Sequence, residues 1–479
     1  MSASPDSREA AQAPPASLPA MPATSATPAV ASGSTLVCAG CGASPAPGDP
    51  YPFRCPNAVR GDDTDHVLRR RLDAPIVFPT PAEAAAEPNP YLAYRRLFHA
   101  YHLARAGGMD DAQYRDLVER LDRAVADVDG HGFTTTPFLR SDALSERLGF
   151  AGDGGVWVKD ETHNVSGSHK ARHLFALLVH LEVVERLGLA DSSDRPHLAI
   201  ASCGNAALAA AVVAAAGGRV LDVFVPVDAD PVVVRRLESL GAHVTVCPRE
   251  PGVPGDPTYH RLRAALAAGA LPFTCQGNEN GLAVESAFTL GYEMATAVAG
   301  TPGLDRLVIQ VGGGALASAC IESLDEAHRL GALERVPRFH AVQTTGAWPL
   351  PRAFERVSAR VPAGADPGQI RAAVTYAATH RSEFMWPWED EPHSVAHGIL
   401  DDETYDWIAI VDGLLATGGG TVVVDEDVLA RANALGVEAT GIDADETGTS
   451  GLAGLLALRQ QGAIGDHERV GVLFTGIRR

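Results

Sequence analysis

After Trp157 the sequence alternates short β-branched runs with Ala- and Leu-rich stretches of helical length, and this alternation limits the chain to few folds. Parallel strands need a helix-length crossover between them, so the pattern is typical of a parallel sheet covered by helices. The sequence therefore predicts an α/β fold with two doubly wound lobes. The predicted strands lie at 198–202, 221–226, 243–247 and 272–275, and in a second series at 307–311, 339–343, 421–424 and 470–474.

The N-terminal part has a different composition. Residues 1–34 are rich in Ala, Pro and Ser and carry three charges, so they bury too little apolar surface to offset the entropy of ordering. We expect a disordered tail without a secretory signal, and hence a cytoplasmic protein. Apolar residues recur at helical spacing over 89–128, which predicts helices at the front of the globular body. The predicted parts are a tail at 1–34, a small Cys-containing ribbon at 35–70, a large lobe of 71–194 plus 278–479, and a smaller mobile lobe at 195–277.

The charge balance excludes one class of partner. The chain has 39 basic and 59 acidic side chains, which gives a net charge of −20. Proteins that bind nucleic acid supply Lys and Arg to neutralise phosphates, so we expect no nucleic-acid partner. The sequence also lacks the long uninterrupted apolar run of a membrane-spanning helix, so we expect no membrane partner.

Two of the 39 basic residues are lysines, Lys159 and Lys170, and the other 37 are arginines. Arginine stays protonated in proteins, so it serves neither as a base nor as an amine that condenses with an aldehyde. A lysine retained in so arginine-rich a chain is therefore a candidate for chemistry that a guanidinium cannot perform.

The first of three candidate loops carries the second lysine. It runs through Ser166-Gly-Ser168-His-Lys170 into a Leu-rich helix. The two serines are good helix caps, which predicts Lys170 in the first turn of that helix. The positive end of the helix, together with His169 and Arg172, disfavours protonation of the amine and favours its action as a nucleophile.

The other two loops also follow predicted strands and precede helices. Ser202-Cys-Gly-Asn205 offers backbone N–H groups at a helix start, which suit a carboxylate. Gly312-Gly-Gly-Ala315 lets the backbone wrap closely around a phosphate. A reactive amine, a carboxylate loop and a phosphate loop together indicate pyridoxal 5′-phosphate, whose aldehyde needs an amine and whose phosphate needs a cradle.

These motifs also resemble those of a known family. Asn164-Val-Ser-Gly-Ser-His-Lys170 resembles the N-P-T-G-S-F-K-D-R motif of threonine synthase and its fold-type II (tryptophan synthase β-like) relatives. Ser202-Cys-Gly-Asn205 resembles their S-S-G-N loop, the glycine loop resembles theirs, and Thr475-Gly resembles the T-G after the last strand. The departures are His169 and Ala171 around the lysine and Cys203 for the second serine.

The resemblance implies a role for each matched residue. Lys170 would hold the cofactor as a Schiff base and then move protons at the substrate, and a neutral Thr475 hydroxyl at the pyridine nitrogen favours elimination and replacement over transamination. Asn205 would bond the 3′-oxygen of the ring. The implied cofactor-binding residues are Lys170, Asn205, Gly312, Gly313, Gly314, Ala315 and Thr475, and the implied substrate-binding residues are Ser166, Ser168, Ser202 and Cys203.

The implied activity is that of a lyase on a small amino-acid substrate, of the threonine synthase type, in a homodimer. For O-phosphohomoserine the site must bind a second phosphate, and His163, His169 and Arg172 are the candidates. Alternatives are a serine or threonine dehydratase or ammonia-lyase, a β-replacement synthase, a non-catalytic protein on the same fold, and a zinc-ribbon interaction protein. Two segments stay without a role: the one with Trp386 and Trp388, either a lid or packing between the lobes, and the one with His393 and His397.

The cysteines leave one question open. The seven residues are too few and too scattered for a disulfide scaffold, and no metal is assigned to the active site. Cys38 and Cys41 form a C-x-x-C knuckle and Cys55 follows, which is typical of a zinc ribbon. The expected fourth cysteine is Ala58, and His66 is an alternative fourth ligand that the spacing does not demand.

Overall fold

The computed structural model describes residues 33–59, 61–73, 75–249 and 256–479. The predicted disordered tail lies outside the described residues except for Gly33 and Ser34, and Ser34 already belongs to a strand. That strand, β1 (Ser34–Cys38), pairs antiparallel with β2 (Leu68–Leu72) to form a two-stranded ribbon.

The larger of two further sheets has six strands in the order β11-β10-β9-β12-β4-β3. All neighbours run parallel except β3 and β4, which pair antiparallel at one edge. The strands are β3 (Phe138–Ser141), β4 (Gly155–Asp160), β9 (Arg306–Gln310), β10 (Arg338–Thr344), β11 (Gly420–Val424) and β12 (Arg469–Phe474).

The second sheet is wholly parallel, in the order β7-β6-β5-β8. Its strands are β5 (Leu198–Ala201), β6 (Leu221–Val225), β7 (His243–Val246) and β8 (Leu271–Pro272). All eight strands predicted from the sequence are confirmed to within a few residues, and so is the α/β class. The strands that were not predicted, β1 to β4, are antiparallel or precede the regular alternation of strands and helices. Strands β5 to β8, within residues 198–272, form one sheet, and strands β3, β4 and β9 to β12 form the other. The exact lobe boundaries remain a prediction.

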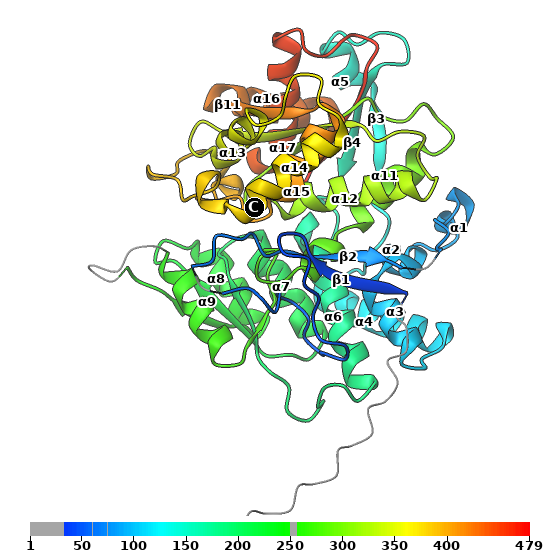
Figure 1. Cartoon of the computed structure of the whole chain (residues 1–479), viewed down its shortest axis with the longest axis vertical. Coiled ribbons are helices and arrows are strands. Elements are labelled where there is room, and N and C mark those ends of the chain that lie inside the picture. The colour runs from blue at the N-terminus through cyan, green and yellow to red at the C-terminus, as the bar shows by residue number, and fades with distance from the viewer. Residues whose placement is uncertain (1–32, 60, 74, 250–255) are drawn as a thin grey trace, which may run out of the picture. The chain divides into compact units, whose positions relative to one another are not determined.

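Helices cover both sheets, as Figure 1 shows. The front segment predicted as helical contains α2 to α4, which confirms that prediction. The helices are α1 (Pro81–Ala85), α2 (Pro90–Ala93), α3 (His99–Ala106), α4 (Asp111–Asp129), α5 (Asp142–Arg147), α6 (Arg172–Arg186), α7 (Asn205–Ala216), α8 (Pro231–Ser239), α9 (Pro257–Ala267), α10 (Leu282–Ser286), α11 (Thr289–Val298), α12 (Ala315–Arg329), α13 (Pro349–Ser358), α14 (Pro367–Thr379), α15 (Trp407–Thr417), α16 (Glu426–Thr440) and α17 (Glu446–Gln460). Over the described ranges, none of them is long and apolar enough to cross a membrane.

A buried charge network explains the first lysine. Lys159 is 0% exposed, and its Nζ donates to Glu293 and to the carbonyl of Thr136. Arg172, also 0% exposed, donates to Glu161 at 2.7 Å and to Glu293 at 2.6 Å. Two cations thus share two carboxylates in the core, so Lys159 is a structural residue.

Candidate active site

The lysine turn follows strand β4. It consists of two 3₁₀ turns, η2 (Val165–Gly167) and η3 (His169–Ala171), so Lys170 lies just before α6 rather than within it. The Ser168 hydroxyl accepts the Lys170 N–H at 3.4 Å, as a cap should. Ser166 does not act as a cap, because its φ is 56°, a positive value found at no other non-glycine residue in the described part of the chain. Strain of this kind persists where the surrounding structure fixes it, and it is common near functional sites.

The three predicted loops meet at one cavity of about 370 Å³. Ile200 to Ala206 form one wall, the glycine loop forms another, and Lys170 and Thr475 lie between them. Every residue that the sequence proposed for cofactor binding lines this cavity, and so do Ser202 and Cys203. Ser166 and Ser168 do not line it. Ser168 caps the turn of Lys170, and Ser166 belongs to the turn before it.

The glycine loop connects β9 to α12 and has the form of an oxyanion cradle. Gly314 caps α12 with a φ of 103°, a conformation that favours glycine. A Cβ on Gly312 would come within 2.3 Å of Asp401 Oδ2, so the loop packs closely around a carboxylate. The Gly313 backbone lies against the same side chain, because a Cβ there would be 3.7 Å from Asp401 Oδ1. A glycine loop that packs on one oxyanion at a helix start also fits a phosphate.

Asp401 complicates this fit because a phosphate would have to share the loop with it. Burial raises the pKa of Asp401 to about 6, although Lys170 and the Gly313 N–H oppose the shift. A phosphate therefore fits best when Asp401 is protonated or turned aside. The sequence pointed to no role for this residue.

Thr475 has a partner that the sequence analysis missed. Gln310, the last residue of β9, donates from Nε2 to Thr475 Oγ1 at 2.9 Å. Because this bond occupies a lone pair of the hydroxyl, the Thr475 proton is available for an acceptor in the cavity. A glutamine directly after the apolar run Leu307–Ile309 of the fully buried strand β9 was the available signal.

Asn205 begins α7, and a residue that does not line the cavity, Arg479, fixes the orientation of its side-chain amide. Arg479 Nε donates to Asn205 Oδ1 at 2.9 Å. This bond assigns the oxygen to the arginine and leaves the amide Nδ2 as the donor available to a ligand. The amide therefore suits a ring oxygen, as the resemblance implies.

Lys170 is the one Lys or Arg among the described residues that line the cavity, beside Asp256, Asp401 and Asp445. The proposal of a second phosphate site at Arg172, His163 or His169 is not supported. Arg172 is already paired with Glu161 and Glu293 in the buried charge network. His163 is exposed and does not line the cavity. Burial holds the pKa of His169 well below 6.5, and its Nδ1 bonds the Thr475 carbonyl at 3.1 Å, so Nε2 is an acceptor rather than a phosphate donor.

The two segments that the sequence left without a role lie in different places. The segment from His397 to Asp401 lines the cavity, whereas His393 does not. Trp386 lies 3.7 Å from the Arg352 guanidinium and Trp388 packs on Trp348, so both pack against α13 and its N-terminal flank. They are neither a lid on the cavity nor packing between the two sheets.

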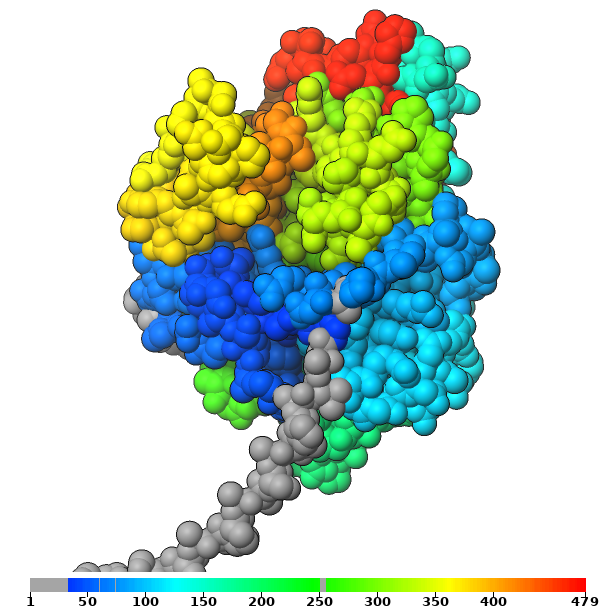
Figure 2. All heavy atoms as spheres, turned by 45° about the vertical axis from the view of Figure 1, so that its right-hand side comes forward, coloured from blue at the N-terminus to red at the C-terminus, as the bar shows by residue number. Residues whose placement is uncertain are grey.

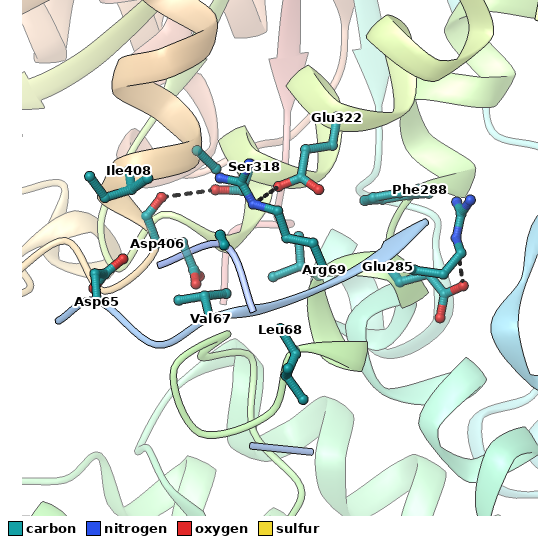
Figure 3. A pocket seen from close by; sticks show the side chains of 15 residues that line it. Asp65, Val67, Leu68, Arg69, Glu285, Phe288, Ser318, Glu322, Asp406 and Ile408 are labelled. Carbon is teal, nitrogen blue, oxygen red and sulfur yellow. Dashed lines mark hydrogen bonds and ion pairs between the residues drawn. The ribbon is translucent and has the colours of Figure 1, made fainter. Parts of the chain in front are cut away.

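A second cavity lies between β2 and the helices α12 and α15, as Figure 3 shows. Its walls include Asp65, Arg69, Glu322 and Asp406, and Arg69 pairs with Glu322 at 3.3 Å. Its volume is about 10 Å³, which is the space of roughly one water molecule. It is too small for a cofactor and marks the place where the ribbon packs on α12 and α15.

Comparison with known proteins agrees with this site. The sequence profile of the family described as "Pyridoxal-phosphate dependent enzyme" matches residues 131–476. Threonine synthase of Methanocaldococcus jannaschii is 22% identical over 347 residues, which are 71% of this chain and 74% of that protein. Maize serine racemase has a TM-score of 0.54 at 17% identity, covering 75% of this chain and 92% of that one. Processed threonine deaminase isoform 2 from Solanum lycopersicum has a TM-score of 0.54 at 16% identity, covering 77% and 91%. The family match spans well over half of the chain, and the chain therefore belongs to the pyridoxal-phosphate dependent enzymes of fold type II.

Proposed function

We propose that this protein is a lyase of the threonine synthase type, which converts O-phosphohomoserine to threonine and phosphate. The observation that carries the lyase assignment is the neutral Thr475 hydroxyl, held by Gln310 in the same cavity as Lys170. A neutral partner for the pyridine nitrogen favours elimination and replacement over transamination. The matched threonine synthase supports the choice of substrate.

The residues divide the work as follows. The bound pyridoxal phosphate supplies an electron sink for negative charge at the substrate α carbon. Lys170 binds the cofactor and moves protons at the α and β carbons. Asn205 donates to the ring oxygen, and the glycine loop binds the phosphate. The backbone at Ser202 and Cys203, near the start of α7, takes the substrate carboxylate. Burial raises the pKa of the Cys203 thiol, so it is a neutral donor near neutral pH.

A second candidate is loss of water and ammonia from serine or threonine. One observation favours it: among the described residues that line the cavity, Lys170 is the one Lys or Arg, and it is assigned to the cofactor, so no further cation is left for a substrate phosphate. A phosphorylated substrate would bring a second dianion beside Asp256, Asp401 and Asp445. A hydroxyl leaving group brings no such charge.

A product assay decides between the two candidates. The purified enzyme, loaded with pyridoxal phosphate, is given O-phosphohomoserine, threonine or serine in separate reactions. Release of inorganic phosphate with formation of threonine supports the threonine synthase reaction. If the enzyme instead forms 2-oxobutanoate or pyruvate with ammonia and releases no phosphate, the threonine synthase reaction is wrong and the dehydratase reaction takes its place.

The Thr475 hydroxyl gives a first prediction. Thr475→Val removes a donor to the ring, and we expect kcat to fall about 10- to 100-fold, the value of one buried hydrogen bond. Thr475→Ser keeps the hydroxyl and is the matched control, expected within about threefold of the wild type. The kcat of both variants is measured by steady-state kinetics, with whichever of the three substrates the wild-type enzyme turns over in the product assay. Equal loss in the two variants would assign the effect to packing instead.

Asp401 gives a second prediction. Asp401→Asn removes a negative charge from the phosphate loop, and we expect the apoenzyme to bind pyridoxal phosphate about tenfold more tightly at pH 8, which is about 1.4 kcal/mol. The pKa of Asp401 is raised to about 6, so the wild type takes up a proton as pH falls through that value, and the advantage of the variant shrinks. The other charged or titratable groups that act on Asp401 are Lys170, Asp402 and Tyr405.

Titration of the apoenzyme with pyridoxal phosphate at pH 5.5 to 8, followed by absorbance, measures the ratio of the two dissociation constants. The ratio cancels the titration of the cofactor itself, which both proteins share. Asp402→Asn is the control, because Asp402 lines the neighbouring outer cavity rather than the cavity of Lys170. A ratio of dissociation constants that does not change with pH would contradict the prediction that the Asp401 carboxylate competes with the cofactor phosphate.

A further inference from the structure

The ribbon brings four metal-ligating side chains to one point. Cys38 ends β1, Cys41 lies in the turn that follows, Cys55 lies in the long connection, and His66 precedes β2. The three sulfur atoms and a ring nitrogen of His66 all lie within 4.8 Å of one another. The fold therefore supplies as fourth ligand the histidine that the sequence spacing left undecided.

The measured distances match a zinc tetrahedron. With Zn–S of about 2.3 Å and Zn–N of about 2.0 Å, the edges of a tetrahedron are about 3.8 Å between sulfurs and about 3.5 Å between sulfur and nitrogen. Cys41 Sγ and Cys55 Sγ are 3.5 Å apart, and Cys38 Sγ is 3.4 Å from His66 Nδ1. A disulfide would need about 2.05 Å between sulfurs.

The surroundings of these atoms also suit a metal. His66 Nε2 lies 2.8 Å from Asp62 Oδ2, so the ring donates its Nε2–H to the carboxylate and its Nδ1 lone pair faces the cysteines. The side chain of Asn57 also points to this cluster, since its Nδ2 donates to Cys41 Sγ at 3.7 Å. Donors of this kind commonly surround metal-bound sulfur, because they stabilise the negative charge that it carries there.

We propose that Cys38, Cys41, Cys55 and His66 bind one Zn²⁺ ion. Four protein ligands leave no open position, which makes the site structural rather than catalytic. Binding releases the thiol protons and involves no change of oxidation state. The competing arrangement is a disulfide between Cys41 and Cys55, which needs an oxidant and a closer approach of the two sulfurs.

The position of this site gives the metal a role in the enzyme. The turn from Asp62 to His66 lines an outer cavity of about 570 Å³, which shares Asp256, Leu400 and Asp401 with the cavity of Lys170. The same turn is bonded to the last turn of α14: the Asp65 N–H donates to the Ala378 carbonyl at 2.6 Å. Figure 2 shows the blue ribbon surface directly beside the yellow segment that contains α14. The metal thus fixes one wall of the space next to the active site.

The zinc content of the full chain tests the proposal. The protein is purified without chelators or a metal-affinity tag, and zinc is measured by inductively coupled plasma mass spectrometry against quantitative amino-acid analysis. We expect about one equivalent of Zn²⁺ per chain. Cys38→Ser and His66→Asn are expected to retain almost none. Cys247→Ser, outside the ribbon, is the matched cysteine control and is expected to keep the full equivalent.

The side chains of a second group, His197, Asp222 and His243, are also close enough to bind a metal ion, with both histidines exposed and the aspartate half-buried. His243→Asn therefore serves as a further control and is expected to leave the zinc content unchanged. Loss of zinc from this variant instead of from His66→Asn would overturn the proposal.

The wild type alone decides the outcome if the ribbon variants do not fold. Wild-type protein that holds no zinc as purified, and none after incubation with excess ZnCl₂ and desalting, would overturn the proposal. So would a Cys41–Cys55 disulfide found by non-reducing peptide mass spectrometry. A melting temperature that falls on treatment with a strong chelator and is restored by added Zn²⁺ would support it. None of these measurements requires substrate or turnover.

Discussion

Lys170→Ala is expected to abolish turnover, with a loss in kcat of about 10³-fold or more, because the variant loses both the covalent attachment of the cofactor and the proton carrier. Lys170 is the only amine that lines the described cavity. The visible absorbance of the bound cofactor should shift toward that of free pyridoxal phosphate. Retention of the wild-type spectrum and rate by the variant would contradict the assignment.

The matched variant is Lys170→Arg, which keeps the positive charge but cannot condense with an aldehyde. We expect it to be as inactive as the alanine variant, and activity in it would assign to Lys170 an electrostatic role only. Borohydride reduction followed by peptide mass spectrometry gives an independent test. The chain has only one other lysine, Lys159, which is fully buried and paired with Glu293, so label should appear on Lys170 alone.

The second large effect concerns stability. Arg172→Met leaves Glu161 and Glu293 in the core with one cation between them, Lys159. Removing one partner from a buried ionic network costs about 3 to 5 kcal/mol, because the remaining charge stays desolvated. We expect the free energy of unfolding to fall by that amount in urea denaturation. The control is Arg329→Met, which breaks an exposed pair with Asp325 and should cost less than about 1 kcal/mol.

The pH dependence of the network has a definite sign. Burial alone would raise the pKa of Glu293, but Arg172 and Lys159 outweigh it, and the pKa is lowered from 4.5. A lowered pKa in the folded state means that the stabilisation is present above about pH 4.5 and is lost as pH falls through the folded-state value. The stability gap between wild type and Arg172→Met should therefore narrow in acid. A gap that widens below pH 4 would contradict this account.

Much of the fold and of the candidate site could be predicted from the sequence, because the relevant signals are local. Strand runs separated by helix-length segments specify a parallel sheet, and the loops after those strands meet at one edge. The glycines at 312–314 and the scarcity of lysine depend on no tertiary contact. These local signals predicted Lys170, the Ser202–Asn205 loop and the glycine loop, whereas Thr475 came from the family resemblance, and all of them line one cavity.

Only the tertiary structure decided how distant side chains are paired. Arg172 lies two residues after the lysine, yet its partner Glu293 lies 121 positions away, so the sequence suggested a phosphate ligand where the core holds an ion pair. Asp401 reaches the glycine loop and His66 reaches the cysteines for the same reason: long-range packing places them, and no spacing rule records it. Local chemistry set what the chain can bind, and its long-range contacts set which residues are available to bind it.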